Sequence, residues 1–167
     1  YRFLEADVAL RVDNLDKAYA ASHRIEETIR AQVPHVERVR IHVEPTVRDH
    51  LRYAVPLTDP AGAVSPHFGE APYLGLVTVR AADGQVTHQE IVANPHTQVE
   101  KAKGIRVAEW LVGLKTDVVL LREEVHGRGP AYVFADAGIE TRSILSTTLA
   151  QALVEASEHL HEEVSST

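Results

Sequence analysis

The chain has 167 residues, 44% of them hydrophobic and 25% charged, and a formal net charge of −7. This composition is typical of a globular protein with one medium domain or two small ones, and the acidic balance argues against a nucleic-acid partner. The absence of cysteine excludes disulfides, thiolate zinc sites and Cys-ligated iron–sulfur clusters. No stretch approaches 18 apolar residues, so no segment is expected to insert into a membrane.

Residues 1–45 are predicted to form a β-α-β unit. Apolar residues alternate with polar ones at both ends of this segment, which indicates two half-buried strands. The sequence between them has the spacing of an amphipathic helix that ends at Pro34. Its predicted apolar stripe consists of Leu15, Tyr19, Ser22, Ile25, Ile29 and Val33. A unit this small needs a partner chain, upstream elements or both, and we expect the chain to be a fragment of a longer protein.

The two strands of this unit carry a candidate metal site. A crossover helix covers the apolar strand faces, so the polar faces lie together on the other side of the sheet. Asp7 from the first strand and His42 with Glu44 from the second are therefore expected to converge. One imidazole and two carboxylates suit Zn²⁺, Fe²⁺ or Mn²⁺ better than Ca²⁺ or Mg²⁺. On spacing alone, the charged face of an edge strand explains the pattern equally.

After a short connector at 45–49, the pattern changes to alternating strands and helices. The strands are predicted at 51–57, 73–80, 86–93, 117–121 and 139–144, and the helices at 99–115, 130–137 and 147–163. The AADG sequence between the second and third of these strands is typical of a hairpin turn. The later strands alternate with helices, which predicts an α/β unit with a mixed sheet.

Two loops of this second unit could bind a ligand. The SPHFG segment places His67 between Pro66 and Phe68, either as a surface turn residue or as a ligand. The HGRGP segment (126–130) follows a buried strand and opens a helix, so its glycines, its arginine and the helix N-terminus could bind an anion. An ordinary glycine-rich connection is the alternative. There is no cysteine nucleophile and no G-x-S-x-G elbow, so we expect no catalytic activity.

The first unit resembles the cytosolic C-terminal domain of cation diffusion facilitator (cation efflux) transporters. The resemblance covers residues 1–45 and is carried by I-E-x-x-I in the helix and by the closing V-x-x-V-x-I-H-V-E-P. It implies a ferredoxin-like fold, dimerisation and a regulatory metal, with His42 and Glu44 matching a ligand pair of the family. Asp7 falls where many members carry a strand histidine, and Tyr19 where many carry a helix histidine, so that ligand is lost. The family's first helix and strand are absent.

The second unit, residues 51–155, resembles the dinitrogenase iron–molybdenum cofactor biosynthesis family. The matching segments are SPHFGEAPY, KGIRVAEWL, DVVLL, HGRGPAYVFADAGIET and TTLAQAL. The resemblance implies a ribonuclease-H-like α/β fold that binds or carries metal clusters. Without cysteine, a cluster would have to arrive with its own ligands. The implied cofactor-binding residues are those of the two loops: His67, Phe68, Gly69, His126, Gly127, Arg128 and Gly129.

Together the resemblances predict an α/β chain of two domains, 1–48 and 49–167. They imply the cytosolic, metal-sensing region of a divalent cation efflux transporter, on the cytoplasmic face of the cell membrane. We expect a homodimer attached to an upstream membrane domain, with Zn²⁺ or Fe²⁺ in the first domain and an iron-containing cluster as a further ligand of the second. The alternative is a soluble metallocluster carrier in which the first unit serves only to dimerise.

Overall fold

The computed structural model describes residues 2–10, 15–45, 48–125 and 127–165, with some side chains near the ends and the linker left undescribed. The chain divides into two compact units, Tyr1–Asp49 and His50–Thr167. We refer to them as unit 1 and unit 2. Among the described residues, every helix is too short or too polar to span a lipid bilayer.

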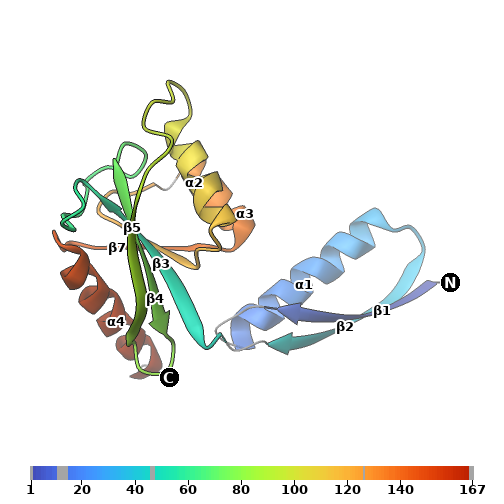
Figure 1. Cartoon of the computed structure of the whole chain (residues 1–167). Helices are drawn as coiled ribbons and strands as arrows, with labels where there is room; N and C mark the ends of the chain where they lie inside the picture. The colour runs from blue at the N-terminus through green and yellow to red at the C-terminus, as the bar shows by residue number, and fades with distance from the viewer. Residues whose placement is uncertain (1, 11–14, 46–47, 126, 166–167) are drawn as a thin grey trace. The chain divides into compact units, whose positions relative to one another are not determined.

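Unit 1 is a parallel two-stranded sheet with one helix along it (Figure 1). It consists of β1 (Arg2–Leu10), α1 (Leu15–Gln32) and β2 (Val36–Pro45). The strands alternate as predicted: Val39 is buried toward the helix, whereas Arg40 and His42 are exposed on the other face. The two strands pair with Glu5 opposite Arg40 and Asp7 opposite His42.

The predicted apolar stripe of α1 is wrong at one of the positions whose side chains are described, and the side chain of Leu15 lies outside them. Tyr19 is 61% exposed, whereas its neighbour Ala18 is buried at 3%. Successive helical residues are separated by about 100° around the axis. The helix therefore presents the small residue to the sheet and leaves the tyrosine in solvent, which allows α1 to approach the strands closely.

Unit 2 contains a five-stranded mixed sheet of order β5-β4-β3-β6-β7. The pairs β3–β4 and β4–β5 are antiparallel, whereas β3–β6 and β6–β7 are parallel. The mixed α/β fold predicted from the sequence is thereby confirmed. Its strands are β3 (His50–Leu57), β4 (Tyr73–Arg80), β5 (Val86–Ala93), β6 (Val118–Leu121) and β7 (Glu140–Ser143), and its helices are α2 (Lys103–Gly113), α3 (Gly129–Ala137) and α4 (Leu149–Ser165).

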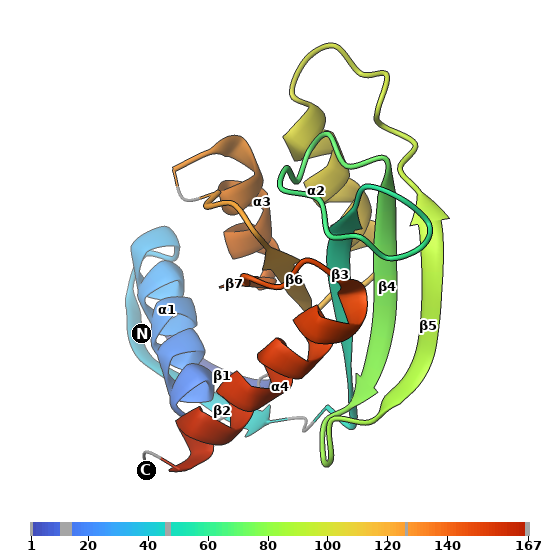
Figure 2. The same cartoon turned by 90° about the vertical axis from the view of Figure 1, so that its left-hand side faces the viewer.

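Helices cover both faces of this sheet, giving three layers (Figure 2). On one face, α4 packs Leu149, Ala152 and Ala156 onto the sheet. On the other, α2 and α3 cover a second cluster that includes Leu111 and Phe134. Strand β6 is buried along its whole length, because its side chains enter both clusters in alternation. Its continuous apolar sequence follows from this double coverage.

The helix predicted at 99–115 is shorter in the structure and begins at Lys103. Ala102 has a left-handed backbone with φ of 55°, so a right-handed helix cannot extend through it. At the other end, Lys115 has φ of 56° and separates the helix from β6. The predicted hairpin turn is present, with the Arg80 amide donating to the Gln85 carbonyl at 2.8 Å.

Candidate functional site

The two loops singled out in the sequence lie at the same edge of the unit 2 sheet. Strands β3, β6 and β7 are parallel, so the segments that follow them leave from their shared carboxyl ends. Strand β5 is antiparallel to β4, which is antiparallel to β3, so β5 also ends at this edge. Loops at the carboxyl ends of strands in open α/β sheets are the usual place for ligand binding. The fold thus gathers the His67 loop, the start of α2 and the start of α3.

Close backbone packing joins these three segments. A Cβ atom placed on Gly69 would lie 3.0 Å from both the Cα and the amide nitrogen of Gly104, at the start of α2. A Cβ on Gly104 would lie 2.9 Å from Cγ of Pro130, at the start of α3. These separations leave no room for further side-chain atoms. We call this contact of Gly69, Gly104 and Pro130 the glycine junction.

The loop that carries His67 has a well-fixed backbone and an exposed imidazole. The Ser65 hydroxyl donates to the His67 carbonyl at 2.9 Å and accepts from the His67 amide at 3.2 Å. The next side chain, Phe68, is buried and packs edge-to-face on Phe134 of α3, with ring centroids 5.4 Å apart. The His67 side chain itself is 64% exposed. A buried anchor therefore holds the chain while the imidazole stays accessible to a ligand.

Glu123 connects the His67 loop to the glycine-rich loop. Its Oε1 accepts a hydrogen bond from the Phe68 amide at 2.6 Å. Its Oε2 lies 3.7 Å from Nδ1 of His67 and 3.5 Å from a guanidinium nitrogen of Arg128. One carboxylate, 25% exposed, thus faces an imidazole and a guanidinium that belong to two different loops.

The starts of α2 and α3 add backbone donors near these side chains. Arg128 is the N-cap of α3, Pro130 occupies its first turn, and neither helix receives a side-chain cap from the described residues. The first amide groups of α2 meet no side-chain cap among the described residues and are available to an anion. At the start of α3, Pro130 has no amide hydrogen and the Ala131 amide donates to the Arg128 carbonyl at 3.0 Å, which leaves the Gly129 amide. Gly127 has φ of 71°, which glycine adopts without strain, and Gly129 begins the helix against the side chain of Ile105. His126 lies outside the described residues.

The candidate metal site of unit 1 is partly visible. Asp7 and His42 are cross-strand partners on the exposed face, as expected from the strand alternation. Next to them on the same face, Arg40 and Glu5 approach to 3.8 Å. The side chain of Glu44 lies outside those described, and among the described residues no three metal-binding groups come together. The three-ligand site stays a prediction.

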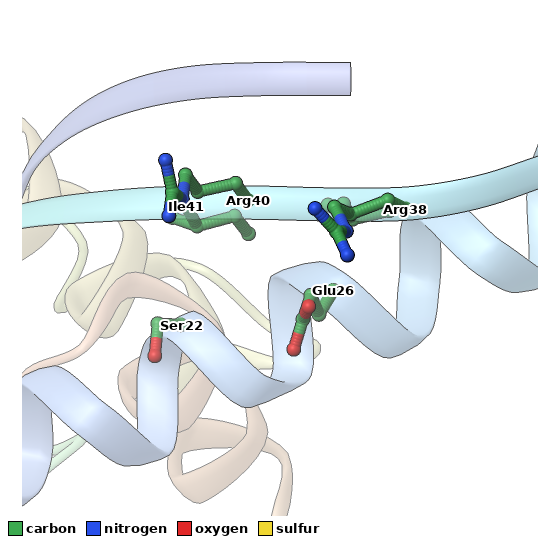
Figure 3. Close-up of a pocket in the computed structure, with 6 residues that line it drawn as sticks. Ser22, Glu26, Arg38, Arg40 and Ile41 are labelled. Carbon is green, nitrogen blue, oxygen red and sulfur yellow. The ribbon is translucent and has the colours of Figure 1, made fainter. Parts of the chain in front are cut away.

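Unit 1 also has an open hollow between α1 and β2 (Figure 3). Asp7 and His42 are not among the described residues that line it. Glu26 on the helix points toward Arg38 on the strand, so the hollow carries charges of both signs. Its lining residues are Ser22, Glu26, Arg38, Val39, Arg40 and Ile41.

Sequence reasoning missed Glu123, the residue that brings the two loops of unit 2 together. A usable signal was present, because Glu123 comes two residues after the fully buried strand β6 and just before the glycine-rich loop. Polar residues in this position lie at the carboxyl edge of a parallel strand, where sites form. In the sequence, however, REE is indistinguishable from a solvated charged turn.

Comparison with known proteins places this three-layer domain in a family related to a metal cofactor. A family model described as dinitrogenase iron-molybdenum cofactor matches residues 50–159, and the chain belongs to this family. A second model, described as the cytoplasmic domain of cation efflux proteins, matches residues 1–46. Both resemblances noted in the sequence are confirmed, in the predicted order.

Two solved structures are similar to part of this chain. The apo form of the orange protein from Desulfovibrio gigas is 28% identical, with a TM-score of 0.54, and the match covers 67% of this chain and 92% of that one. An NMR structure of a Thermotoga protein of the DUF35 family is 24% identical, with a TM-score of 0.49, over 65% of this chain and 88% of that one. No curated protein matches the chain.

Proposed function

We propose that the chain is the metal-responsive cytoplasmic region of a divalent cation efflux transporter, with a metal-cofactor-binding domain as its second unit. The observation that carries this proposal is the tandem match of a cation efflux cytoplasmic domain and an iron-molybdenum cofactor domain in one chain. The role we propose is binding and regulation, without catalysis. The membrane part of the same transporter and a second copy of the chain are the expected partners.

The proposed ligand of unit 2 is an anionic metal cofactor held at His67 and Arg128. An exposed imidazole can coordinate a metal, and a guanidinium beside it favours negative charge. The first amide groups of α2 and the Gly129 amide of α3 favour the same sign of charge. Because the chain has no cysteine, the cofactor would carry its own sulfide or other inorganic ligands. These features fit a metallocluster better than a bare cation.

In unit 1 we propose that Asp7, His42 and Glu44 bind Zn²⁺ or Fe²⁺. The register that sets Asp7 opposite His42 supports this proposal. Replacing His42 with alanine is expected to abolish or strongly weaken zinc binding in a calorimetric titration. His23→Ala removes an exposed histidine from α1 instead and serves as the control. Equal zinc affinity in the two variants would contradict the site.

Cofactor binding by unit 2 can be tested with isolated iron–molybdenum cofactor as the probe. The protein is incubated with the probe and passed through gel filtration, and the molybdenum that elutes with the protein is measured. We expect retention by the wild type and by His88→Ala, which removes an exposed histidine from β5, and loss of retention in His67→Ala. Retention that is equal in the wild type and His67→Ala would contradict the proposed site.

A soluble metallocluster carrier is the second candidate. It is favoured by the orange protein match, because the match takes in 92% of that protein while covering 67% of this chain. The two candidates differ in what is encoded upstream of Tyr1. Apolar segments long enough to span a membrane are expected for the transporter, and their absence from the complete gene would favour the carrier.

A further inference from the structure

We propose that Glu123 is the positioning residue of the unit 2 site, selecting the tautomer of His67 that presents Nε2 to a metal and holding Arg128 beside it. This inference rests on the proposed binding of a metal cofactor at His67. It adds a residue that contacts the ligand only through its neighbours.

The Glu123 carboxylate is itself held in place by the backbone. Its Oε1 accepts from the Phe68 amide at 2.6 Å, and that amide belongs to a residue whose side chain is buried against Phe134. The carboxylate cannot turn away without losing this hydrogen bond. Its Oε2 is consequently left facing Nδ1 of His67 at 3.7 Å and Arg128 at 3.5 Å.

This placement distinguishes the two nitrogens of the imidazole. A neutral imidazole carries one N–H and one lone pair, and a carboxylate accepts a hydrogen bond only from the protonated nitrogen. With Oε2 on the Nδ1 side, the proton belongs on Nδ1, and the lone pair on Nε2 is free for a metal. At 3.7 Å the contact is longer than a hydrogen bond, so in this geometry the negative charge of Oε2 favours an N–H on the nearer ring nitrogen without a formed hydrogen bond.

Metal-binding histidines commonly donate their second N–H to a carboxylate, and removing that carboxylate typically weakens metal binding by about 10- to 100-fold. Glu123 also faces Arg128, so the guanidinium is kept near the imidazole before any ligand arrives. The same carboxylate thus sets both the coordinating atom and the cation that favours an anionic cofactor.

Glu123 could instead serve only to link the two loops through its hydrogen bond with the Phe68 amide. The variant Glu123→Gln distinguishes this structural role from the positioning of His67. The glutamine oxygen can still accept from the Phe68 amide, so the hydrogen bond between the loops is preserved. The amide group that replaces Oε2 is a donor, however, and cannot accept from Nδ1 of His67. Glu124→Gln is the matched control, because it makes the same change at the next residue, whose side chain is exposed.

The first measurement is the tautomer of His67 in the metal-free protein, by ¹⁵N NMR of the imidazole at about pH 8.5, where an ordinary imidazole is neutral. We expect the Nδ1–H form in the wild type and in Glu124→Gln, and a shift toward the Nε2–H form in Glu123→Gln. Glu123→Asp, which restores the carboxylate, is expected to recover part of the Nδ1–H population. The same tautomer in all variants would overturn the inference.

The second measurement is the affinity for isolated iron–molybdenum cofactor, followed by retained molybdenum. We expect binding to weaken about 10- to 100-fold in Glu123→Gln and to stay unchanged in Glu124→Gln. If the wild type retains none, the proposed function fails, and the NMR result alone decides the role of Glu123. If binding depends on His67 but not on Glu123, the proposed function stands and the positioning role is overturned.

Discussion

The two units of this chain differ in how they bury apolar surface. Unit 2 has a buried cluster on each face of its sheet, one under α4 and one under α2 and α3. In unit 1 only Ala18 and Val39 belong to the buried core of the described residues, and Phe3 is exposed on the uncovered face of the sheet. A β-α-β unit with so little burial cannot offset the conformational entropy lost on folding. We therefore expect unit 2 to be stable alone and unit 1 to depend on contacts with other protein.

The difference also extends to the candidate sites. The Asp7–His42 pair lies on an exposed sheet face, which no described residue of unit 1 buries. The backbone at the His67 site is fixed by the buried Phe68 side chain, which packs on Phe134, and by the hydrogen bond from the Phe68 amide to Glu123. We therefore expect the unit 1 site to be completed by association, and the unit 2 site to be largely formed before a ligand binds.

The largest expected effect follows from dilution of the whole protein. We expect a homodimer at micromolar concentration, and at concentrations where it dissociates we expect unit 1 to unfold while unit 2 stays folded. Hydrogen-exchange mass spectrometry at several concentrations would show faster exchange in α1 and unchanged protection in β6. Light scattering on the same samples would report the mass. A monomer with protected α1 would contradict the dependence of unit 1 on a partner chain.

A smaller effect is expected from the glycine junction of unit 2. In Gly104→Ala the new methyl group would lie 2.9 Å from Cγ of Pro130, and overpacking of this kind costs about 1–3 kcal/mol of the free energy of unfolding. Gly113→Ala is the control in the same helix, because its Cβ would meet nothing within 4 Å. There we expect no loss, or a gain of about 0.5–1 kcal/mol from helix propensity.

Urea unfolding followed by the fluorescence of Trp110 in α2 would measure both variants. Equal stability of Gly104→Ala and Gly113→Ala would show that the junction is looser than its distances indicate. Neither substitution is expected to change hydrogen exchange in unit 1.

The smallest expected effect is a decrease in the free energy of unfolding of unit 2 as the pH rises in the alkaline range. Burial raises the pKa of Tyr53, while Arg142 opposes and Glu140 adds to this shift. The pKa of Tyr53 is higher in the folded state than in the unfolded chain, so the neutral tyrosine contributes to the free energy of unfolding. This contribution is fully present below about pH 10 and is lost as the pH rises toward the folded-state pKa. The loss amounts to about 1.4 kcal/mol per unit of pKa difference.

Tyr53→Phe removes the ionisable hydroxyl and is expected to reduce the loss of unfolding free energy at alkaline pH. Tyr132→Phe, which changes an exposed tyrosine of the same unit, should leave the decline as it is in the wild type. Urea unfolding of the three proteins between about pH 8 and 11 would compare them. A decline that is identical in all three would remove Tyr53 as its cause.

Much of this fold could be predicted because its strands and helices have clear periodicity. The alternating strands of unit 1 and the continuous apolar sequence of β6 indicate their burial directly. Predictions were wrong where the outcome depended on a single backbone angle or on neighbouring elements. Ala102 has no side-chain feature that marks it as left-handed, and only packing in three dimensions decides between Ala18 and Tyr19.

The candidate site was predictable only in part for a similar reason. A histidine before a buried aromatic could be noticed in the sequence, and the family resemblance suggested its role. Glu123 could not be connected to it, because 55 residues separate Glu123 from Phe68 and the contact forms only through the parallel pairing of β3 and β6. Side chains that meet across strand ends become visible once the strand order is known.

The glycine junction has a consequence for how sequences of this kind can vary. The side chains at positions 104 and 130 compete for the same space, because a methyl group on residue 104 would collide with the ring of Pro130. Alanine at 130 has no Cγ, so a chain that replaced both residues would relieve the collision that the first change creates. The two substitutions are therefore expected to be non-additive, with the double variant less destabilised than the sum of the single ones. Among related chains, a side chain at position 104 should accompany loss of proline at position 130.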